Sequence, residues 1–178
     1  PVFLTYQQAV IQYAGLDPFT ANDQEIAQLG IKLAGSDLEL NRDGCLDMIM
    51  SHKVEKALPK NQLVFIYNYP ASQAALAKLN KDDNGQEIAE RFEVYLNGLE
   101  LANGYHELTD SAEQRQRFEK ELAGTNRPLD EKLITAMGHK EARLPDCAGV
   151  AMGLDRILML QLGAKSIAEV ISFSTQHC

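Results

Sequence analysis

The chain has 178 residues, 45% of them hydrophobic, and a formal net charge of -8 at pH 7. This length and composition predict one domain with enough apolar residues to bury a core. The acidic balance counts against unspecific binding of nucleic acid, which depends on Lys and Arg, and no apolar run reaches membrane-spanning length.

The cysteines and the first residue bear on the compartment and the extent of the chain. Cys45, Cys147 and Cys178 are odd in number and form no C-x-x-C pair, and no secretory signal is present. Free thiols in a reducing cytoplasm are therefore expected. The sequence begins at Pro1, so we expect a processed chain or a piece of something longer.

Helical signals dominate the first 60 residues. Residues 5–14 predict a helix that is ended by Asp17-Pro18, and a second helix is expected over about 22–34. A third is expected over 45–57, because its apolar residues recur on one face.

A strand-forming pattern follows. The run LVFIYNY, which is ended by Pro70, predicts a buried strand. Residues 71–79 favour a short helix, and 80–85 favour a polar loop.

A β-hairpin is predicted over 88–107. Asn97-Gly98 is the strongest short hairpin signal, because both residues tolerate the positive φ of a type I′ turn. The expected register pairs Tyr95 with Glu100 and Glu93 with Ala102, which leaves one face apolar and puts both glutamates on the other. Two such carboxylates are tolerated when a cation lies between them, and oxygen ligands suit Mg²⁺. The alternative is a solvated face with ordinary glutamates.

The second strand of the hairpin carries further polar residues. Asn103 could hydrogen-bond a carboxylate, and Glu107 could pair with an ammonium group. In a regular strand these two share a face that excludes Glu100, so a common ligand requires a bulge near Ala102–Gly104. The alternative is an edge strand that runs into a loop.

The remaining elements are mostly helical. One helix is expected from Thr109 or Asp110 to about residue 123, and another from Pro128 to about residue 137. Residues 165–173 favour a short helix and a terminal strand.

A strand enters a helix through glycines near the end of the chain. Residues 147–152 predict the strand, and Gly153 begins a helix whose leucines have core spacing: Leu154, Ile157, Leu158 and Leu162. A helix N-terminus favours phosphate, and Arg156 in the first turn could meet a triphosphate bidentately. The alternative is a pairing with Asp155, since a glycine pair alone is a weak signal.

These residues carry a family resemblance. GVAMGLDRILML (149–160) resembles motif 3 of class II aminoacyl-tRNA synthetases, and RFEVYLNGLELANGYHELTD (91–110) resembles the lysine-binding hairpin of lysyl-tRNA synthetases. YPASQAAL (69–76) resembles the strand and loop before that hairpin. The N-terminal TYQQAVIQYAGLDP is similar to the matching segment of elongation factor P–(R)-β-lysine ligases.

The resemblance implies a fold and its organisation. An α+β fold is expected, with part of a class II antiparallel sheet flanked by helices. Residues 1–178 would form a single domain, the C-terminal part of such a catalytic domain. Within it, 1–60 would be a helical insertion region and 61–178 the sheet with the lysine-binding hairpin and motif 3. A partial sheet should also expose an edge.

The resemblance also implies a site that uses ATP and Mg²⁺. Glu93 and Glu100 would hold Mg²⁺ and ATP phosphates. Asn103 would bind the amino-acid carboxylate, and Glu107 would pair with a substrate amine. Arg156 would contact the γ-phosphate of ATP as the catalytic residue.

Two positions favour the ligase over the synthetase. Lysyl-tRNA synthetases typically have glycine where this chain has Ala151, and usually serine where it has His106. The extra methyl group would reshape the substrate pocket, to which Ala151 and Gly153 are assigned. This is expected for β-lysine, whose amino group lies one carbon further along.

One required residue is missing. The family's motif 2 has an aromatic-Arg-x-Glu pattern, and the only similar arginine, Arg91, belongs to the hairpin. Little or no turnover is therefore expected from these 178 residues alone.

For the full-length protein, the resemblance implies a cytoplasmic homodimer that adenylates (R)-β-lysine and transfers it to a lysine of elongation factor P. The alternatives are part of a lysyl-tRNA synthetase, which would act on lysine and tRNA, and a non-catalytic ligand-binding or structural domain.

Overall fold

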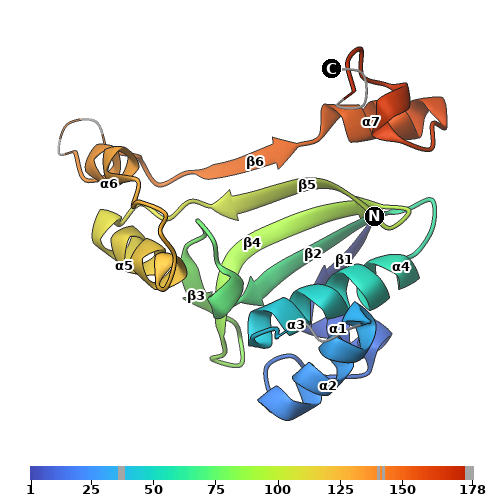
Figure 1. The fold of residues 1–178 in the computed structure, drawn as a ribbon, viewed down its shortest axis with the longest axis horizontal. Helices are drawn as coiled ribbons and strands as arrows, with labels where there is room; N and C mark the ends of the chain where they lie inside the picture. Colours follow the sequence, from blue (N-terminus) through green and yellow to red (C-terminus); the bar gives the residue numbers. More distant parts are fainter. Residues whose placement is uncertain (36–38, 140, 142, 175–178) are drawn as a thin grey trace.

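A six-stranded sheet forms the centre of the fold (Figure 1). The computed structural model describes residues 1–35, 39–139, 141 and 143–174. The order of strands is β1-β2-β4-β5-β6, and β3 pairs with β4 beside this path. The strands are β1 (Val2–Thr5), β2 (Leu63–Pro70), β3 (Leu79–Lys81), β4 (Glu87–Leu96), β5 (Leu99–His106) and β6 (Ala148–Met152). All pairs are antiparallel except β1 with β2.

Helices precede and follow the central strands. The α-helices are α1 (Tyr6–Ala14), α2 (Asp23–Ala34), α3 (Arg42–Ile49), α4 (Glu55–Ala57), α5 (Ser111–Leu122), α6 (Glu131–Met137) and α7 (Leu154–Leu162). A π-helical turn, Met50–Val54, joins α3 to α4, and 3₁₀ turns lie at Ala71–Gln73 and Ile167–Glu169. The mixed composition confirms the predicted α+β class.

Capping explains where the first two helices begin. At α1, the side chain of Thr5 accepts from the backbone N–H of Gln8, and the side chain of Gln8 accepts from the backbone N–H of Thr5. Asn22 and Glu25 form the same reciprocal pair at α2. Such reciprocal caps satisfy N–H groups that have no partner within the helix. The predicted helices over 5–14 and 22–34 are confirmed.

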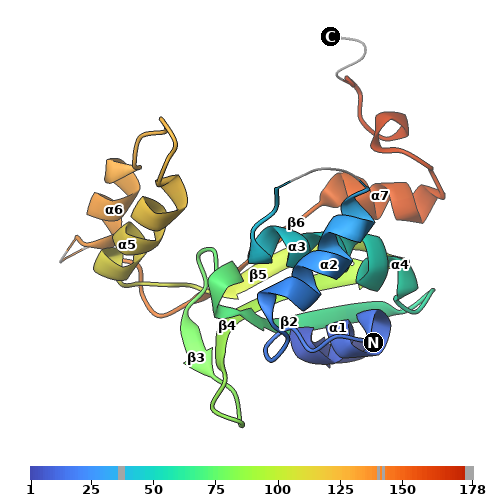
Figure 2. The same ribbon diagram turned by 60° about the horizontal axis from the view of Figure 1, so that its bottom comes forward.

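The hydrophobic core joins α1–α4 to one face of the sheet. Figures 1 and 2 show these helices gathered beside the β1 and β2 half of the sheet. The largest fully buried core side chains include Tyr6, Val10, Ile26, Leu46, Ile49, Val64, Ile66 and Tyr95. In β5 only Tyr105 packs against the margin of this core, so the rest of the same face of β5 and β6 is available for a site.

Two predictions before the hairpin are corrected. The parallel strand β1 was not expected, since four residues before a helix are too few to display a strand period. The helix predicted over 71–79 is wrong: a single 3₁₀ turn follows Pro70, and the chain then forms β3. Isolated Ala-rich segments favour helix, but here the backbone of Leu76–Lys78 bonds to His106–Leu108, and this pairing outweighs that propensity.

The predicted core role of α7 is also wrong. Leu154 is 73% exposed and Leu162 66%, and α7 projects beyond β6 (Figure 1). The terminal strand expected within 165–173 is not formed by the residues that the structure describes. Periodicity identifies an apolar face but not the surface that covers it. The edge strand β6 exposes Val150 and Met152 as well, in agreement with the expected exposed edge.

The described cysteines are free thiols. Cys45 is buried in the core, where burial raises the pKa of its thiol, and Cys147 is half-buried. Cys178 lies outside the described residues. Among the helices of the described ranges, none is both long enough and apolar enough to cross a bilayer.

Candidate active site

The tip of the β4–β5 hairpin is fixed against the helical region. Asn97 and Gly98 have φ angles of 57° and 78°, which confirms the predicted type I′ turn. Asn97 accepts a hydrogen bond from the backbone N–H of Asn61 at 2.7 Å. A Cβ atom at Gly98 would lie 2.6 Å from the carbonyl oxygen of Glu55, so the turn packs directly on α4. This contact sets the position of the glutamates that follow the turn.

A bulge aligns the polar residues of β5. Glu100 pairs as predicted, whereas Glu93 pairs with Asn103 instead of Ala102. The extra residue is Leu101, one position earlier than the predicted bulge. It reverses the facing of every later residue. As a result Glu93, Glu100 and Asn103 share one face.

That face continues onto β6. Asn103 pairs with Ala151, and Tyr105 pairs with Arg91 on one side and Gly149 on the other. Directly paired residues have Cβ atoms about 4.5–5.5 Å apart. We call the face of β4, β5 and β6 that carries these residues the front face. Most of the sequence-predicted site residues therefore lie on one surface.

Glu93 is the centre of a buried polar cluster. It is 7% exposed, and its Oε2 accepts hydrogen bonds from the hydroxyls of Tyr69, at 2.6 Å, and Tyr95. Its Oε1 lies 2.5 Å from Nη2 of Arg91, whose guanidinium stacks 4.5 Å above the Tyr69 ring. Burial, and then the nearby negative charge, raise the pKa of both tyrosines, so both stay protonated donors. The cluster holds Glu93 in one orientation.

Arg156 meets Glu100 where β6 enters α7. Its Nη1 donates to the carbonyl oxygen of Glu100 at 2.7 Å and lies 3.5 Å from the carboxylate. The N–H of Gly153 donates to Leu101 at 2.9 Å, which ties the start of α7 to the bulge. The side chains of Arg156 and Glu100 are 39% and 36% exposed, so both remain accessible to a ligand.

A cavity of about 220 Å³ lies between the helical region and the front face. Its lining includes the carboxylates Asp47, Glu55, Glu93 and Glu100 and a single cation, Arg91. Burial raises the pKa of Glu55, and the charges of Glu93 and Glu100 raise it further. Burial also raises the pKa of Asp47. This excess of negative charge favours a cation. Sequence reasoning missed Asp47 and Glu55.

The donors suit a magnesium ion that is shared with phosphates. Within the described ranges, no three His, Cys, Asp or Glu side chains are placed to bind one metal ion. Mg²⁺ usually takes one or two carboxylates, with waters and substrate phosphates completing its shell. Glu100 fits this role because it is accessible and only weakly paired, whereas both oxygens of Glu93 already accept hydrogen bonds.

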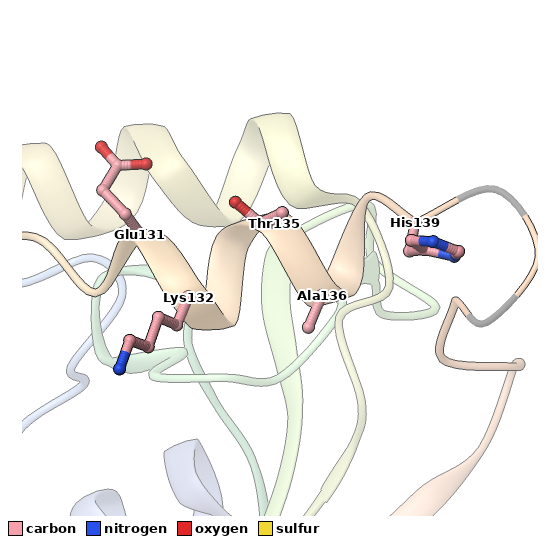
Figure 3. A pocket seen from close by; sticks show the side chains of 5 residues that line it. All are labelled: Glu131, Lys132, Thr135, Ala136 and His139. Atoms are coloured by element: carbon pink, nitrogen blue, oxygen red, sulfur yellow. The ribbon is translucent and has the colours of Figure 1, made fainter.

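A second hollow, of about 560 Å³, lies beside α6 (Figure 3). In Figure 3 the side chains of Glu131 and Lys132 point in opposite directions, and Glu131 is already paired with Arg115. None of the sequence-predicted site residues lines this hollow, and its polar groups do not converge. Its lining residues are Glu131, Lys132, Thr135, Ala136 and His139.

Comparison with known families agrees with this geometry. The model of the family tRNA synthetases class II (D, K and N) matches residues 4–177, which is 174 of the 178 residues. The chain belongs to this family. Membership in the class II synthetases implies a ligase-type domain that binds ATP and an amino acid. It confirms the predicted resemblance to class II aminoacyl-tRNA synthetases, and the match covers the helical region as well as the sheet.

His106 lies on the opposite face of β5 from Asn103 and Tyr105. It alternates with Asn103 and Tyr105 along β5, so its ring points away from the front face. Its Nδ1 lies 2.5 Å from Glu90, and its Nε2 lies 2.8 Å from Asp146. This residue therefore joins β4 and β5 to the segment that leads into β6, instead of contacting a ligand on the front face.

The His106 pairing predicts a pH-dependent stability. Asp146 and then Glu90 raise the pKa of His106, while Lys78 and then His106 lower the pKa of Asp146, so that this carboxylate stays ionised where His106 titrates. The stabilisation is complete below about pH 6.5, the pKa of an unfolded histidine, and is lost as pH rises through the raised pKa. Urea unfolding of the wild type and of His106→Gln should differ most at pH 6 and least at pH 9. A difference that is independent of pH contradicts this account.

Proposed function

We propose that the protein adenylates (R)-β-lysine with ATP and then transfers it to a lysine side chain of elongation factor P. The proposal rests on one observation: the bulge at Leu101 puts Glu93, Asn103 and Ala151 in a single cross-strand row. Arg156 closes the end of this row at Glu100. We place the reaction in the cytoplasm and expect the full-length protein to be a homodimer.

Each residue would have a separate task. Arg156 would hold the γ-phosphate, and Glu100 would bind the Mg²⁺ that neutralises phosphate charge. Glu93, whose oxygens already accept hydrogen bonds, would add negative charge beside that ion. Asn103 would orient the amino-acid carboxylate for attack on the α-phosphate, with pyrophosphate leaving. Glu107 would pair with a substrate amine. The recipient lysine amine would then attack the mixed anhydride, and AMP would leave. Catalysis would come from positioning and charge neutralisation.

The side chains around Asn103 support this assignment. Its Oδ1 is buried and has no hydrogen-bond partner among the described residues. Buried polar atoms are normally bonded, so this oxygen has capacity to accept from a donor of the ligand, such as an amine, whereas the substrate carboxylate would be met by the donating NH₂ group of the same amide. Ala151 is the direct cross-strand partner of Asn103, and its methyl group therefore lies beside the proposed carboxylate position. A methyl group there would favour a substrate whose amino group is one carbon further from the carboxylate, as in β-lysine compared with α-lysine.

Ala151→Gly tests the proposed choice of amino acid. The full-length variant should shift ATP–pyrophosphate exchange from (R)-β-lysine toward α-lysine, because the pocket regains the space of one methyl group. A methyl-sized change typically alters discrimination by roughly 10–200-fold. Ala148→Gly, which removes a methyl group from the other face of β6, should leave the preference unchanged. An unchanged preference in Ala151→Gly contradicts the ligase assignment.

A lysyl-tRNA synthetase is the alternative within the same family. It would use the same first step, so the wild-type protein would prefer α-lysine in the exchange assay and would charge tRNA. The net charge of -8 does not favour tRNA contacts by this segment. In either case we propose that the 178 residues alone turn over little, because no motif 2 arginine is present outside the hairpin.

A further inference from the structure

The carboxylate of Glu107 lies across the backbone of β6. A Cβ atom built on Gly149 would be 2.4 Å from Oε1 of Glu107 and 3.6 Å from its Cδ. No side chain larger than hydrogen at position 149 is compatible with this placement. Gly149 is also the cross-strand partner of Tyr105 on the front face, so the carboxylate of Glu107 lies on the face that carries the proposed site.

The backbone of Glu107 is held by hydrogen bonds on both sides. Its N–H donates to the carbonyl of Cys147 at 2.9 Å, which ties it to the segment before β6. On its other side, Leu108 donates to Leu76, and Lys78 donates to His106, each at 2.8 Å. Held from both sides, the backbone fixes the point from which the side chain of Glu107 extends, and in the structure that side chain lies over Gly149.

The need for glycine at 149 does not come from the backbone of β6. Gly149 is not among the residues of positive φ, and glycine within a strand is less favourable than alanine. The group that a Cβ would meet is the end of a flexible side chain, which can rotate away at small cost. Gly104 differs, because a Cβ there would meet the ring of Phe92 at 2.5 Å and the carbonyl of Gly149 at 2.8 Å.

We infer that Gly149 is a positioning residue for Glu107: its missing side chain lets the carboxylate lie where it meets the amine of the substrate. This inference rests on the proposed function. Gly149→Ala should leave the fold intact and turn Glu107 away. Affinity for the diamino acid should then fall by about 10–100-fold, the loss of one charge-assisted hydrogen bond. Affinity for ATP should not change.

Calorimetric titration of the full-length protein with (R)-β-lysine, L-lysine and ATP·Mg²⁺ tests the inference. Gly149→Ala should weaken binding of the preferred amino acid in the wild-type background. In a Glu107→Gln background it should have no further effect, because Gly149 acts only through that carboxylate. Val150→Ile, which adds a methyl group on the exposed back face of β6, is the matched control and should bind as the wild type.

Three outcomes would overturn the inference. They are unchanged amino-acid affinity in Gly149→Ala, an equal loss in both backgrounds, and a large drop in the melting temperature of Gly149→Ala. If the wild type binds neither amino acid, the proposed function itself fails and the inference fails with it. Wild-type binding with an unaffected Gly149→Ala variant leaves the proposed function standing and rejects only the role of Gly149.

Discussion

Arg91→Ala is expected to lower the free energy of unfolding by about 3–5 kcal/mol, because it leaves the buried carboxylate of Glu93 without its counter-charge. The side chains of the pair are only 19% and 10% exposed. Burial by itself lowers the pKa of Arg91, yet the charge and hydrogen bond of Glu93 raise it overall, so the guanidinium stays charged. The variant also loses the stacking on Tyr69 and the hydrogen bond to the carbonyl of Gln73.

Urea unfolding at pH 7 measures this effect. Arg115→Ala is a suitable control, since Arg115 makes a bidentate pair with Glu131 at the surface, and its unfolding midpoint should hardly move. A double variant, Arg91→Met with Glu93→Gln, should recover much of the stability, because the neutral amide removes the uncompensated charge and its oxygen still accepts from a tyrosine hydroxyl. If Arg91→Ala and Arg115→Ala unfold at the same midpoint, the buried cluster is not a stabilising unit.

Arg156→Ala is expected to reduce ATP–pyrophosphate exchange of the full-length protein by roughly 10²–10³-fold, the usual cost of losing one preorganised charge at a reacting centre. Its Nη1 donates to the carbonyl of Glu100, which holds the guanidinium beside that residue. Arg156→Lys should recover little, because an ammonium group cannot keep that bond and bind phosphate bidentately.

Exchange rates at saturating ATP and amino acid separate the contribution of Arg156 to catalysis from its contribution to binding. Arg127→Ala, in the exposed loop between α5 and α6, removes the same charge far along the chain from the site and should keep full activity. Equal activity of the two variants contradicts the assignment of Arg156 to the triphosphate.

Local signals were sufficient to predict several parts of this fold. Asn97-Gly98 predicts its own turn, because only such residues adopt two successive positive φ angles easily. The caps at Thr5 and Asn22 likewise mark the helix starts with side chains that are adjacent in sequence. The roles of the candidate site residues came from the family resemblance. These residues share one face because of a bulge at Leu101, which was predicted near Ala102–Gly104, one residue later in the sequence.

The missed features depend on contacts between distant segments. Asp47 and Glu55 flank the apolar stripe of the third predicted helix, which was the one available hint that they face the sheet. Their approach to Glu93 and Glu100 also depends on the π-helical turn between α3 and α4, and such turns are often found near functional sites. The exposure of α7 could not be predicted either. Its sequence shows which face of the helix is apolar, but not whether another part of the protein covers that face.

A crystal structure of the full-length protein with Mg²⁺ and a non-hydrolysable analogue of β-lysyl adenylate tests the central claim most directly. We predict the analogue on the front face of β4, β5 and β6, with its carboxyl-derived end at Asn103 and an amine at Glu107. Arg156 should lie beside the phosphate-binding region next to Glu100. An analogue bound elsewhere, for instance in the hollow beside α6, would contradict the assignment of the whole site.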